Sequence, residues 1–141
     1  MDVSSVMTAT PAFCTKDTPL RDVAQMMADN DCGLIPVVGA ANAPVGVVTD
    51  RDIAVRIVAK GRDSQSTLAG DCMTTPVTTI GDDSTLAECC DVLEGKQIRR
   101  VPVVDASGSL CGIVSLADVA LSSRDQKIAE VLKHVSEPTH H

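Results

Sequence analysis

The chain consists of two related halves, and this internal repeat limits its possible folds more than any other feature. Met7-Thr8 returns as Met73-Thr74, an offset of 66 residues (73 − 7), and Pro36-Val37-Val38 returns as Pro102-Val103-Val104. Further pairs match at this offset: Leu20 with Leu86, Gly46 with Gly112, Asp52 with Asp118, and Ala54 with Ala120. Solenoids need three or more units, so two long repeats predict two similar lobes related by pseudo-two-fold symmetry. Clefts between such lobes favour small-ligand binding.

The composition restricts the classes of partner. Hydrophobic residues make up 44% of the 141 residues, and Phe13 is the single aromatic, so we expect one compact protein with an aliphatic core. A net charge of −7 and the lack of aromatic stacking platforms argue against nucleic-acid binding. The start of the chain lacks a signal-peptide pattern, and no apolar run is long enough to cross a membrane. We therefore expect a cytoplasmic protein.

Cysteine and histidine give little support to a metal site. The six cysteines form no C-x-x-C motif, and most have apolar neighbours: Cys14, Cys32, Cys72, Cys89, Cys90 and Cys111. Free cysteines of this kind usually pack as small hydrophobes in a reduced compartment. The histidines all lie near the C-terminus: His134, His140 and His141. We expect no bound metal, although a metal- or redox-responsive protein stays open as a weaker alternative.

Each repeat predicts a strand, a helix, two strands and a second helix, which is an α/β (or α+β) β-α-β-β-α unit. In the first repeat we expect a strand over 12–15, a helix from Pro19 capped by Thr18, strands over 33–38 and 45–48, and a helix from Thr49. In the second we expect a helix capped by Ser84, strands over 98–104 and 110–114, and a helix from Ser115. The first helix of each repeat carries an apolar stripe: Leu20, Val23, Ala24 and Met27, then Leu86, Cys89, Cys90 and Leu93.

These elements suggest the boundaries of the domains. We predict repeat 1 over residues 1–62, a polar linker over 63–70, repeat 2 over 71–124, and a C-terminal helix and tail over 125–141.

Two matched segments, 46–52 and 112–118, carry the chemistry. Each has a glycine, two β-branched residues, a hydroxyl (Thr49 or Ser115) where the strand becomes a helix, and an aspartate three residues later (Asp52 or Asp118). Free backbone N–H groups at a helix start favour phosphate, and a carboxylate can accept two hydrogen bonds from a ribose diol. The combination suggests a nucleotide. The same spacing also resembles a helix capping box, and the residues alone do not decide between the two roles.

The repeats resemble a tandem pair of CBS (cystathionine-β-synthase type) domains, in the short stand-alone form found in bacteria. The resemblance rests on the Met-Thr starts, LIPVV at 34–38, IRRVPVVD at 98–105 and the two Gly-to-Asp segments, and it covers roughly residues 5 to 122. It implies binding of adenosyl compounds: AMP, ADP or ATP, sometimes S-adenosylmethionine or NAD. It also implies a homodimer with an unknown regulated protein as partner.

The resemblance further implies two pockets. The first pocket has Thr49, Arg51 and Asp52 for phosphate and ribose, with Val77, Ile98, Arg99 and Arg100 from the opposite repeat. The second pocket has Ser115 and Asp118, with Ala12, Cys32 and Gly33 around the base.

The two pockets differ in charge. Aligning the IRR segment at 98–100 with DCG at 31–33, and Arg51 with Ala117, leaves the second pocket without arginines. We therefore expect the Thr49/Asp52 pocket to prefer multiply charged phosphates. An alternative for Arg99 and Arg100 is a salt-bridged or solvated face.

The expected function is regulatory sensing of an adenine nucleotide in clefts between the repeats. We do not expect an enzyme, because the sequence offers no nucleophile–base pair and no P-loop. A ligand-free, dimeric protein-interaction module is the main alternative.

Overall fold

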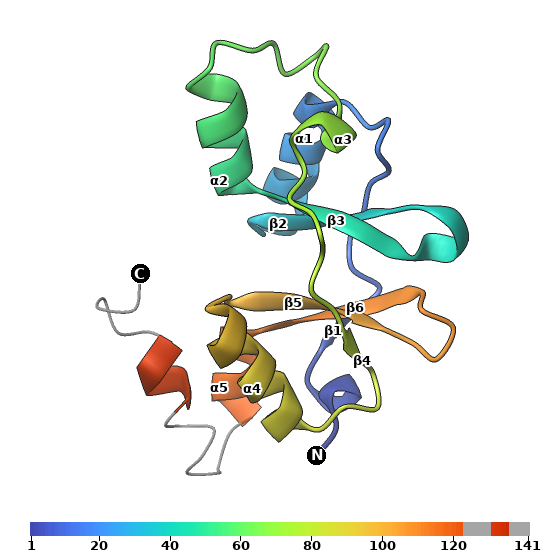
Figure 1. Cartoon of the computed structure of the whole chain (residues 1–141), viewed down its shortest axis with the longest axis vertical. Coiled ribbons are helices and arrows are strands. Elements are labelled where there is room, and N and C mark those ends of the chain that lie inside the picture. Colours follow the sequence, from blue (N-terminus) through green and yellow to red (C-terminus); the bar gives the residue numbers. More distant parts are fainter. Residues whose placement is uncertain (123–130, 136–141) are drawn as a thin grey trace. The chain divides into compact units, whose positions relative to one another are not determined.

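The computed structural model describes residues 1–122 and 131–135 (Figure 1). The chain forms two compact units: unit 1 contains Met1–Pro11 and Thr78–His141, and unit 2 contains Ala12–Val77. The units therefore do not follow the sequence repeats exactly, because the first eleven residues join the second repeat. Residues 63–70, predicted as a linker, belong to unit 2. Of the predicted C-terminal helix, residues 131–135 are helical, and 125–130 and 136–141 lie outside the described residues.

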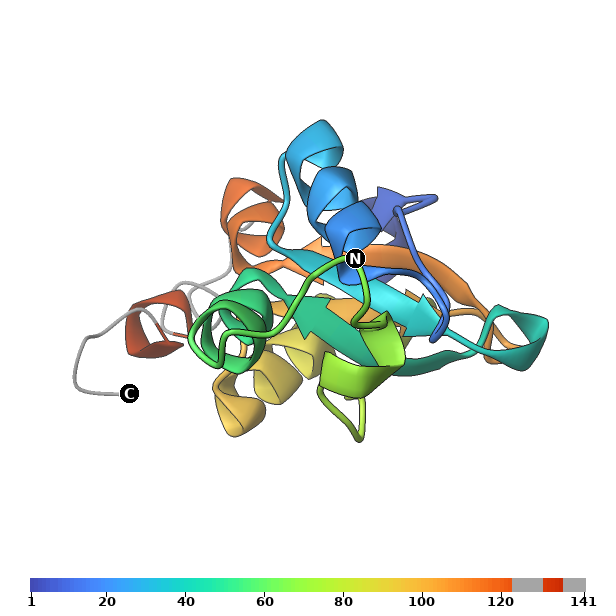
Figure 2. The same cartoon turned by 90° about the horizontal axis from the view of Figure 1, so that it is seen from above.

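Unit 2 is built on an antiparallel hairpin of β2 (Leu34–Val38) and β3 (Pro44–Thr49). Around it lie α1 (Leu20–Asn30), η2 (Ala40–Asn42), α2 (Asp50–Asp52), the π-helix η3 (Ile53–Val58) and α3 (Ala69–Cys72). Figure 1 shows α1 and α2 on the same side of this hairpin, and Figure 2 shows the helix of residues 50–58 continuing from the end of β3.

Unit 1 repeats this plan. Its elements are η1 (Val3–Ser5), β1 (Thr8–Ala9), β4 (Ile80–Gly81), α4 (Leu86–Lys96), β5 (Arg100–Val104), β6 (Leu110–Ser115) and α5 (Leu116–Ser122). The strands form one sheet in the order β1-β6-β5-β4, in which only β4 and β5 run parallel. The predicted α/β class is confirmed, and the four long strands lie where the β-branched runs place them, within two residues at each end.

The edges of the two sheets are also equivalent, although unit 2 forms only single bridges there. Cys14 pairs in parallel with Val37, as Ile80 pairs with Val103 in unit 1. The predicted strand over 12–15 is therefore wrong except at Cys14. The Cys14 N–H donates to the Pro36 carbonyl and the Val38 N–H donates to the Cys14 carbonyl, at 3.0 and 2.8 Å. The next bond toward residue 12 would need an N–H at residue 36, which proline lacks, so the ladder cannot extend in that direction.

Each unit has its own aliphatic core. In unit 2 the core joins Leu20 and Val23 of α1 to Ile35, Val48 and Ile57. In unit 1, four residues of α4 are buried: Leu86, Cys89, Cys90 and Leu93. The predicted stripes are confirmed except for Ala24, which is exposed because α1 buries a narrower face through Leu20, Val23 and Met27.

The predicted caps of α1 and α4 are wrong by one residue. Pro19 occupies the cap position of α1 and makes no side-chain bond. The first helical N–H groups, of Leu20 and Arg21, donate instead to the Thr67 and Ser64 carbonyls at 2.9 and 3.1 Å. The polar 60–70 stretch thus caps the helix through its backbone, which no local motif reveals.

In α4 the cap is Thr85 rather than Ser84. Thr85 Oγ1 accepts from the Glu88 N–H at 3.1 Å, and Glu88 Oε2 accepts from the Thr85 N–H at 3.3 Å. The glutamate three residues after Thr85 completes this capping box, whereas Ser84 has no such partner three residues later.

Candidate ligand site

Thr49 and Asp52 form a reciprocal capping box at the end of β3. The Asp52 N–H donates to Thr49 Oγ1 at 3.0 Å, and the Thr49 N–H donates to Asp52 Oδ2 at 2.9 Å. Ser115 and Asp118 repeat this arrangement at the end of β6, with both distances at 3.0 Å. Both aspartates therefore start helices, as the capping alternative predicts. The box occupies one carboxylate oxygen, so a role in ligand binding depends on what surrounds the other one.

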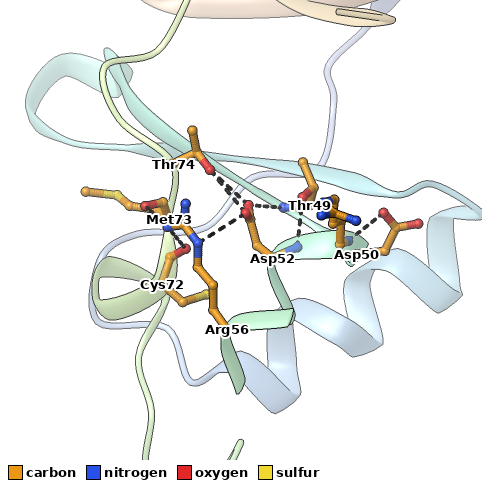
Figure 3. Close-up of polar contacts among 8 residues, drawn as sticks. Thr49, Asp50, Asp52, Arg56, Cys72, Met73 and Thr74 are labelled. Carbon is orange, nitrogen blue, oxygen red and sulfur yellow. Dashed lines mark hydrogen bonds and ion pairs between the residues drawn. The ribbon is translucent and has the colours of Figure 1, made fainter. Parts of the chain in front are cut away.

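In unit 2, additional groups surround the Asp52 carboxylate (Figure 3). Thr74 Oγ1 lies 3.1 Å from Oδ1 and 3.2 Å from Oδ2 and donates to the carboxylate, while Arg56 Nε lies 3.7 Å from Oδ1. Asp52 is only 8% exposed. Its carboxylate is therefore satisfied from within its own unit.

Asp118 lacks this second set of partners. Among the described residues, its side chain is bonded only within the capping box with Ser115. Thr8 stands at the position of Thr74, but no bond joins it to Asp118, and Ser122 stands at the position of Arg56. The Ser122 hydroxyl donates to the Asp118 main-chain carbonyl at 2.8 Å. Asp118 is partly exposed, and within the described residues no hydrogen-bond donor contacts its Oδ1, which is the open oxygen of this carboxylate.

The strand register places arginine beside Ser115. Arg100 is directly opposite Ser115 in the β5–β6 ladder, and the Leu116 N–H donates to the Arg99 carbonyl at 2.8 Å. Residues directly opposite one another across antiparallel strands point to the same face, with Cβ atoms about 5 Å apart.

The equivalent positions in unit 2 carry no arginine. Leu34 is opposite Thr49, and the Asp50 N–H donates to the Gly33 carbonyl at 2.9 Å. The register therefore aligns IRR at 98–100 with CGL at 32–34, and the predicted alignment with DCG at 31–33 is wrong by one residue. The 66-residue offset of the repeat gives the same correction, since 98 − 66 = 32.

The predicted site residues consequently divide between the units. Unit 2 contains Ala12, Cys32, Gly33, Thr49, Arg51, Asp52 and Val77, and unit 1 contains Ile98, Arg99, Arg100, Ser115 and Asp118. Within their own units, Gly33 lies beside Asp50 and Arg100 is opposite Ser115, whereas the predicted pockets combine residues of both units. That combination stays a prediction. Arg51, Arg99 and Arg100 are exposed, and among the described residues none of their side chains is ion-paired.

The cysteines lie mainly in the cores. Cys14, Cys72, Cys89 and Cys90 are buried, and no disulfide joins any of the six cysteines. Burial raises the pKa of Cys14 to about 11 and that of Cys89 to about 12. Cys32 is partly buried, and its Sγ lies 3.7 Å from the Leu34 carbonyl. No group of three or more potential metal ligands occurs within residues 1–122 and 131–135.

Sequence reasoning missed Thr74 and Arg56 as partners of Asp52. Met73-Thr74 was recognised as a repeat start, but its side chains pack on the other repeat, where the Met73 sulfur fills the space beside Gly46. Met7 packs against Gly112 in the same way. The matched Met-Thr and glycine positions are the sequence signal for this pairing. Arg56 follows Asp52 by four residues, which is the spacing of an ion pair on a helix.

The chain belongs to the CBS domain family, whose model matches residues 3–59 and 69–125. It is similar to the CBS domain-containing protein YhcV of Bacillus subtilis, with 33% identity over 127 residues that cover 90% of this chain and 89% of that protein. It also matches the uncharacterized protein MK0525 of Methanopyrus kandleri at 33% identity, covering 70% of this chain but only half the length of that relative. None of the described helices is long and apolar enough to span a membrane.

Two solved structures have the same fold and different ligands. Hypoxic Response Protein I, with two coordinated zinc ions, aligns with a TM-score of 0.80 and 30% identity over 87% of this chain and 99% of its own. The CBS domain protein PAE2072 from Pyrobaculum aerophilum, complexed with AMP, aligns with a TM-score of 0.78 and 27% identity over 94% of this chain and 98% of its own.

Proposed function

We propose that this protein is a regulatory sensor of adenine nucleotides rather than an enzyme. AMP, ADP and ATP are the leading ligands, and S-adenosylmethionine and NAD are further members of the same class. The observation that carries the proposal is the open carboxylate oxygen of Asp118, beside Ser115 and opposite Arg100 in the strand register. A carboxylate suits a ribose diol, and a guanidinium suits a phosphate.

The family supports this choice of ligand. CBS pairs of similar fold are complexed with AMP, as in PAE2072 and in CBSX2, which aligns at 25% identity with a TM-score of 0.73. In our proposal the ligand lies in clefts formed by the two repeats, and Ala12, Val77 and Ile98 contribute apolar contacts to the base. The resemblance to the family suggests further residues that line the clefts, namely Thr49, Arg51, Cys32, Gly33 and Arg99.

The proposed mechanism is a population shift. A nucleotide that binds one arrangement of the repeats more tightly favours that arrangement, and a partner protein then reads it. The ligand can shift the balance only by its difference in affinity for the two states.

We also propose that a second copy of the chain is one partner. Val55 and Leu121 occupy matched positions on the two capped helices and are 42% and 89% exposed, and Val58 is 71% exposed. Exposed apolar residues on helices favour association, which is the specific observation behind the alternative of a ligand-free, dimeric interaction module. We propose a cytoplasmic location on composition alone.

A zinc-dependent function receives less support. The zinc-containing relative shares the fold, but the described part of this chain groups no three metal ligands. Elemental analysis of the purified protein distinguishes the two cases directly.

The test of the proposed function is thermal unfolding of the wild-type protein with AMP, ADP, ATP, NAD and S-adenosylmethionine. A ligand at one hundred times its Kd stabilises by about 2.7 kcal/mol, which raises the melting temperature by several degrees. We expect a selective rise with adenine nucleotides that is much smaller in Asp118→Asn. No rise with any compound, and no nucleotide absorbance at 260 nm in the purified protein, would overturn the sensor and favour the interaction module.

A further inference from the structure

The Asp52 carboxylate holds the chain segment that leaves unit 2. Thr74, which donates to both carboxylate oxygens, lies three residues before the last residue of the unit, Val77. Arg56, the second partner of Asp52, donates through Nη1 to the carbonyls of Cys72 and Met73 at 3.2 and 3.4 Å (Figure 3). Asp52 and Arg56 together therefore bind residues 72–74 through side chains.

Backbone contacts fasten the same segment. The Thr74 N–H donates to the Val47 carbonyl at 2.7 Å, and the Val47 N–H donates to the Thr74 carbonyl at 3.2 Å. The backbone of segment 72–74 is thus bonded to β3. Side-chain hydrogen bonds connect the same segment to Asp52 and Arg56, in the helix that follows β3.

The other copy of the repeat makes the backbone pairing without the side-chain bonds. Thr8 is paired with Ile113, as Thr74 is with Val47, so the two threonines occupy equivalent places. Within the described residues, however, Thr8 makes no bond to Asp118, and Ser122 replaces Arg56. Around the carboxylate, the two copies therefore differ in the bond from Thr74 and in the ion pair with Arg56.

We propose that Asp52 is an anchor for segment 72–74 and that the Thr74 hydroxyl occupies the place a ligand hydroxyl would need. Asp118 is then the carboxylate that is free to accept a diol. The anchor depends only on unit 2, while the unequal use of the two carboxylates rests on the proposed function. Thr74 is accordingly a specificity-determining residue, and Arg56 is a positioning residue.

The hydrogen bonds of each carboxylate explain why the two should bind a ligand with unequal affinity. A diol that approaches Asp52 must displace the Thr74 hydroxyl and gains only the difference between two similar hydrogen bonds. At Asp118 the diol gains hydrogen bonds to an open charged oxygen. A hydrogen bond to a charged group changes a binding constant by roughly ten- to a hundredfold, so Asp118 binds more tightly by about that factor.

The same competition provides regulation. Thr74 is itself exposed, so a ligand at high concentration can replace its hydroxyl on Asp52. Displacement releases segment 72–74 from the helix start, a few residues before the chain passes into unit 1 at Thr78. Binding at Asp52 and release of this segment are then one event.

The anchor is tested without any ligand, by amide hydrogen exchange of Thr74→Val and the matched variant Thr8→Val. Valine keeps the shape of threonine and removes the hydroxyl. We expect exchange at Val47 and Thr74 to accelerate about tenfold or more in Thr74→Val. In Thr8→Val, exchange at Thr8 and Ile113 should stay unchanged. Thr74→Ser keeps the hydroxyl and should restore protection. Equal effects of the two valine variants would overturn the anchor.

The competition is tested by equilibrium dialysis with AMP. Asp118→Asn leaves Asp52 as the remaining carboxylate, and we expect it to bind AMP about ten- to a hundredfold more weakly than the wild type. Adding Thr74→Val to this variant should tighten AMP binding about tenfold, whereas adding Thr8→Val should not. Unchanged binding after Thr74→Val would overturn the role of Thr74 in specificity. If the wild type itself binds no AMP, the proposed function and the unequal carboxylates both fail, and the exchange experiment still decides the anchor.

Discussion

Arg100 is directly opposite Ser115 across β5 and β6, whereas Leu34 occupies the same place opposite Thr49. The two repeats thus share their backbone register and their capping boxes but differ in charge beside the hydroxyl. Arg100 therefore lies beside the capping box of Ser115 and Asp118 within unit 1. The expected preference of the Thr49/Asp52 pocket for multiply charged phosphates stays a prediction, and the experiments below distinguish the two halves.

Replacing Arg100 by leucine, the residue of the other repeat, should weaken binding of phosphorylated ligands. We expect the affinity for ATP to fall about tenfold, because a charge-assisted hydrogen bond is lost, and the affinity for adenosine to change little. Isothermal titration calorimetry at low and high salt measures the affinities for ATP and for adenosine. Arg21→Leu, an exposed arginine on α1, controls for the change in net charge. An equal loss for adenosine and ATP would contradict the role of Arg100.

Removing the cap of α4 tests the start of that helix. Thr85→Ala should lower the free energy of unfolding by about 1 kcal/mol, because the Glu88 N–H loses its acceptor. Ser84→Ala, one residue earlier, should change it by a few tenths at most. Urea denaturation of both variants gives the answer, and a larger loss in Ser84→Ala would disprove the assignment of the cap.

The core of unit 1 depends on α4. Leu93 is fully buried, so Leu93→Ala should cost about 2–5 kcal/mol in the free energy of unfolding through lost burial and an added cavity. Leu121→Ala removes the same atoms from a residue that is 89% exposed, and at protein concentrations where the chain is monomeric it should cost less than about 0.5 kcal/mol. Similar losses at the two positions, measured by urea denaturation, would contradict the packing.

The buried thiols predict a loss of stability in alkali. Burial raises the pKa of Cys89 above the ordinary value of 9.0 to about 12, so the folded protein keeps a proton that the unfolded chain releases above pH 9. The unfolded state then binds fewer protons, and the free energy of unfolding falls between pH 9 and about 12 by roughly 1.4 kcal/mol per pH unit for each such thiol.

Cys89→Val is the matched control, since the first repeat has the buried Val23 at this position. The variant should show a shallower alkaline slope in denaturation experiments at pH 9 to 11, with Cys14 still contributing. An unchanged slope would show that Cys89 does not cause the loss.

The fold could be predicted because the hydrophobic pattern of each helix and strand is a local property of the sequence, and this pattern occurs in both repeats. The runs around Val37 and Val103 became β2 and β5, and the stripe of α4 is buried as its spacing requires. The helix starts were less predictable. The start of α1 is capped by the Ser64 and Thr67 carbonyls, which lie more than forty residues away in the sequence. Helix propensity depends on nearby residues and does not reveal such a contact.

The two capping boxes could be predicted from the sequence, whereas ligand binding at them stays a prediction. The hydroxyl–aspartate boxes follow from a spacing of three residues, so they were found, and both of their candidate roles were stated. The Thr74–Asp52 bond joins residues 22 apart through the return of the chain onto β3, so only the folded structure reveals it. The pairing of Arg100 with Ser115 likewise depends on strand register, which single-strand patterns leave undefined.

The stoichiometry of AMP binding tests the central claim most directly. We expect titration calorimetry of the wild-type protein to give one tight site per chain, and Asp118→Asn to remove it while leaving the fold intact by circular dichroism. Two equal sites per chain, or one tight site that survives Asp118→Asn, would contradict the account.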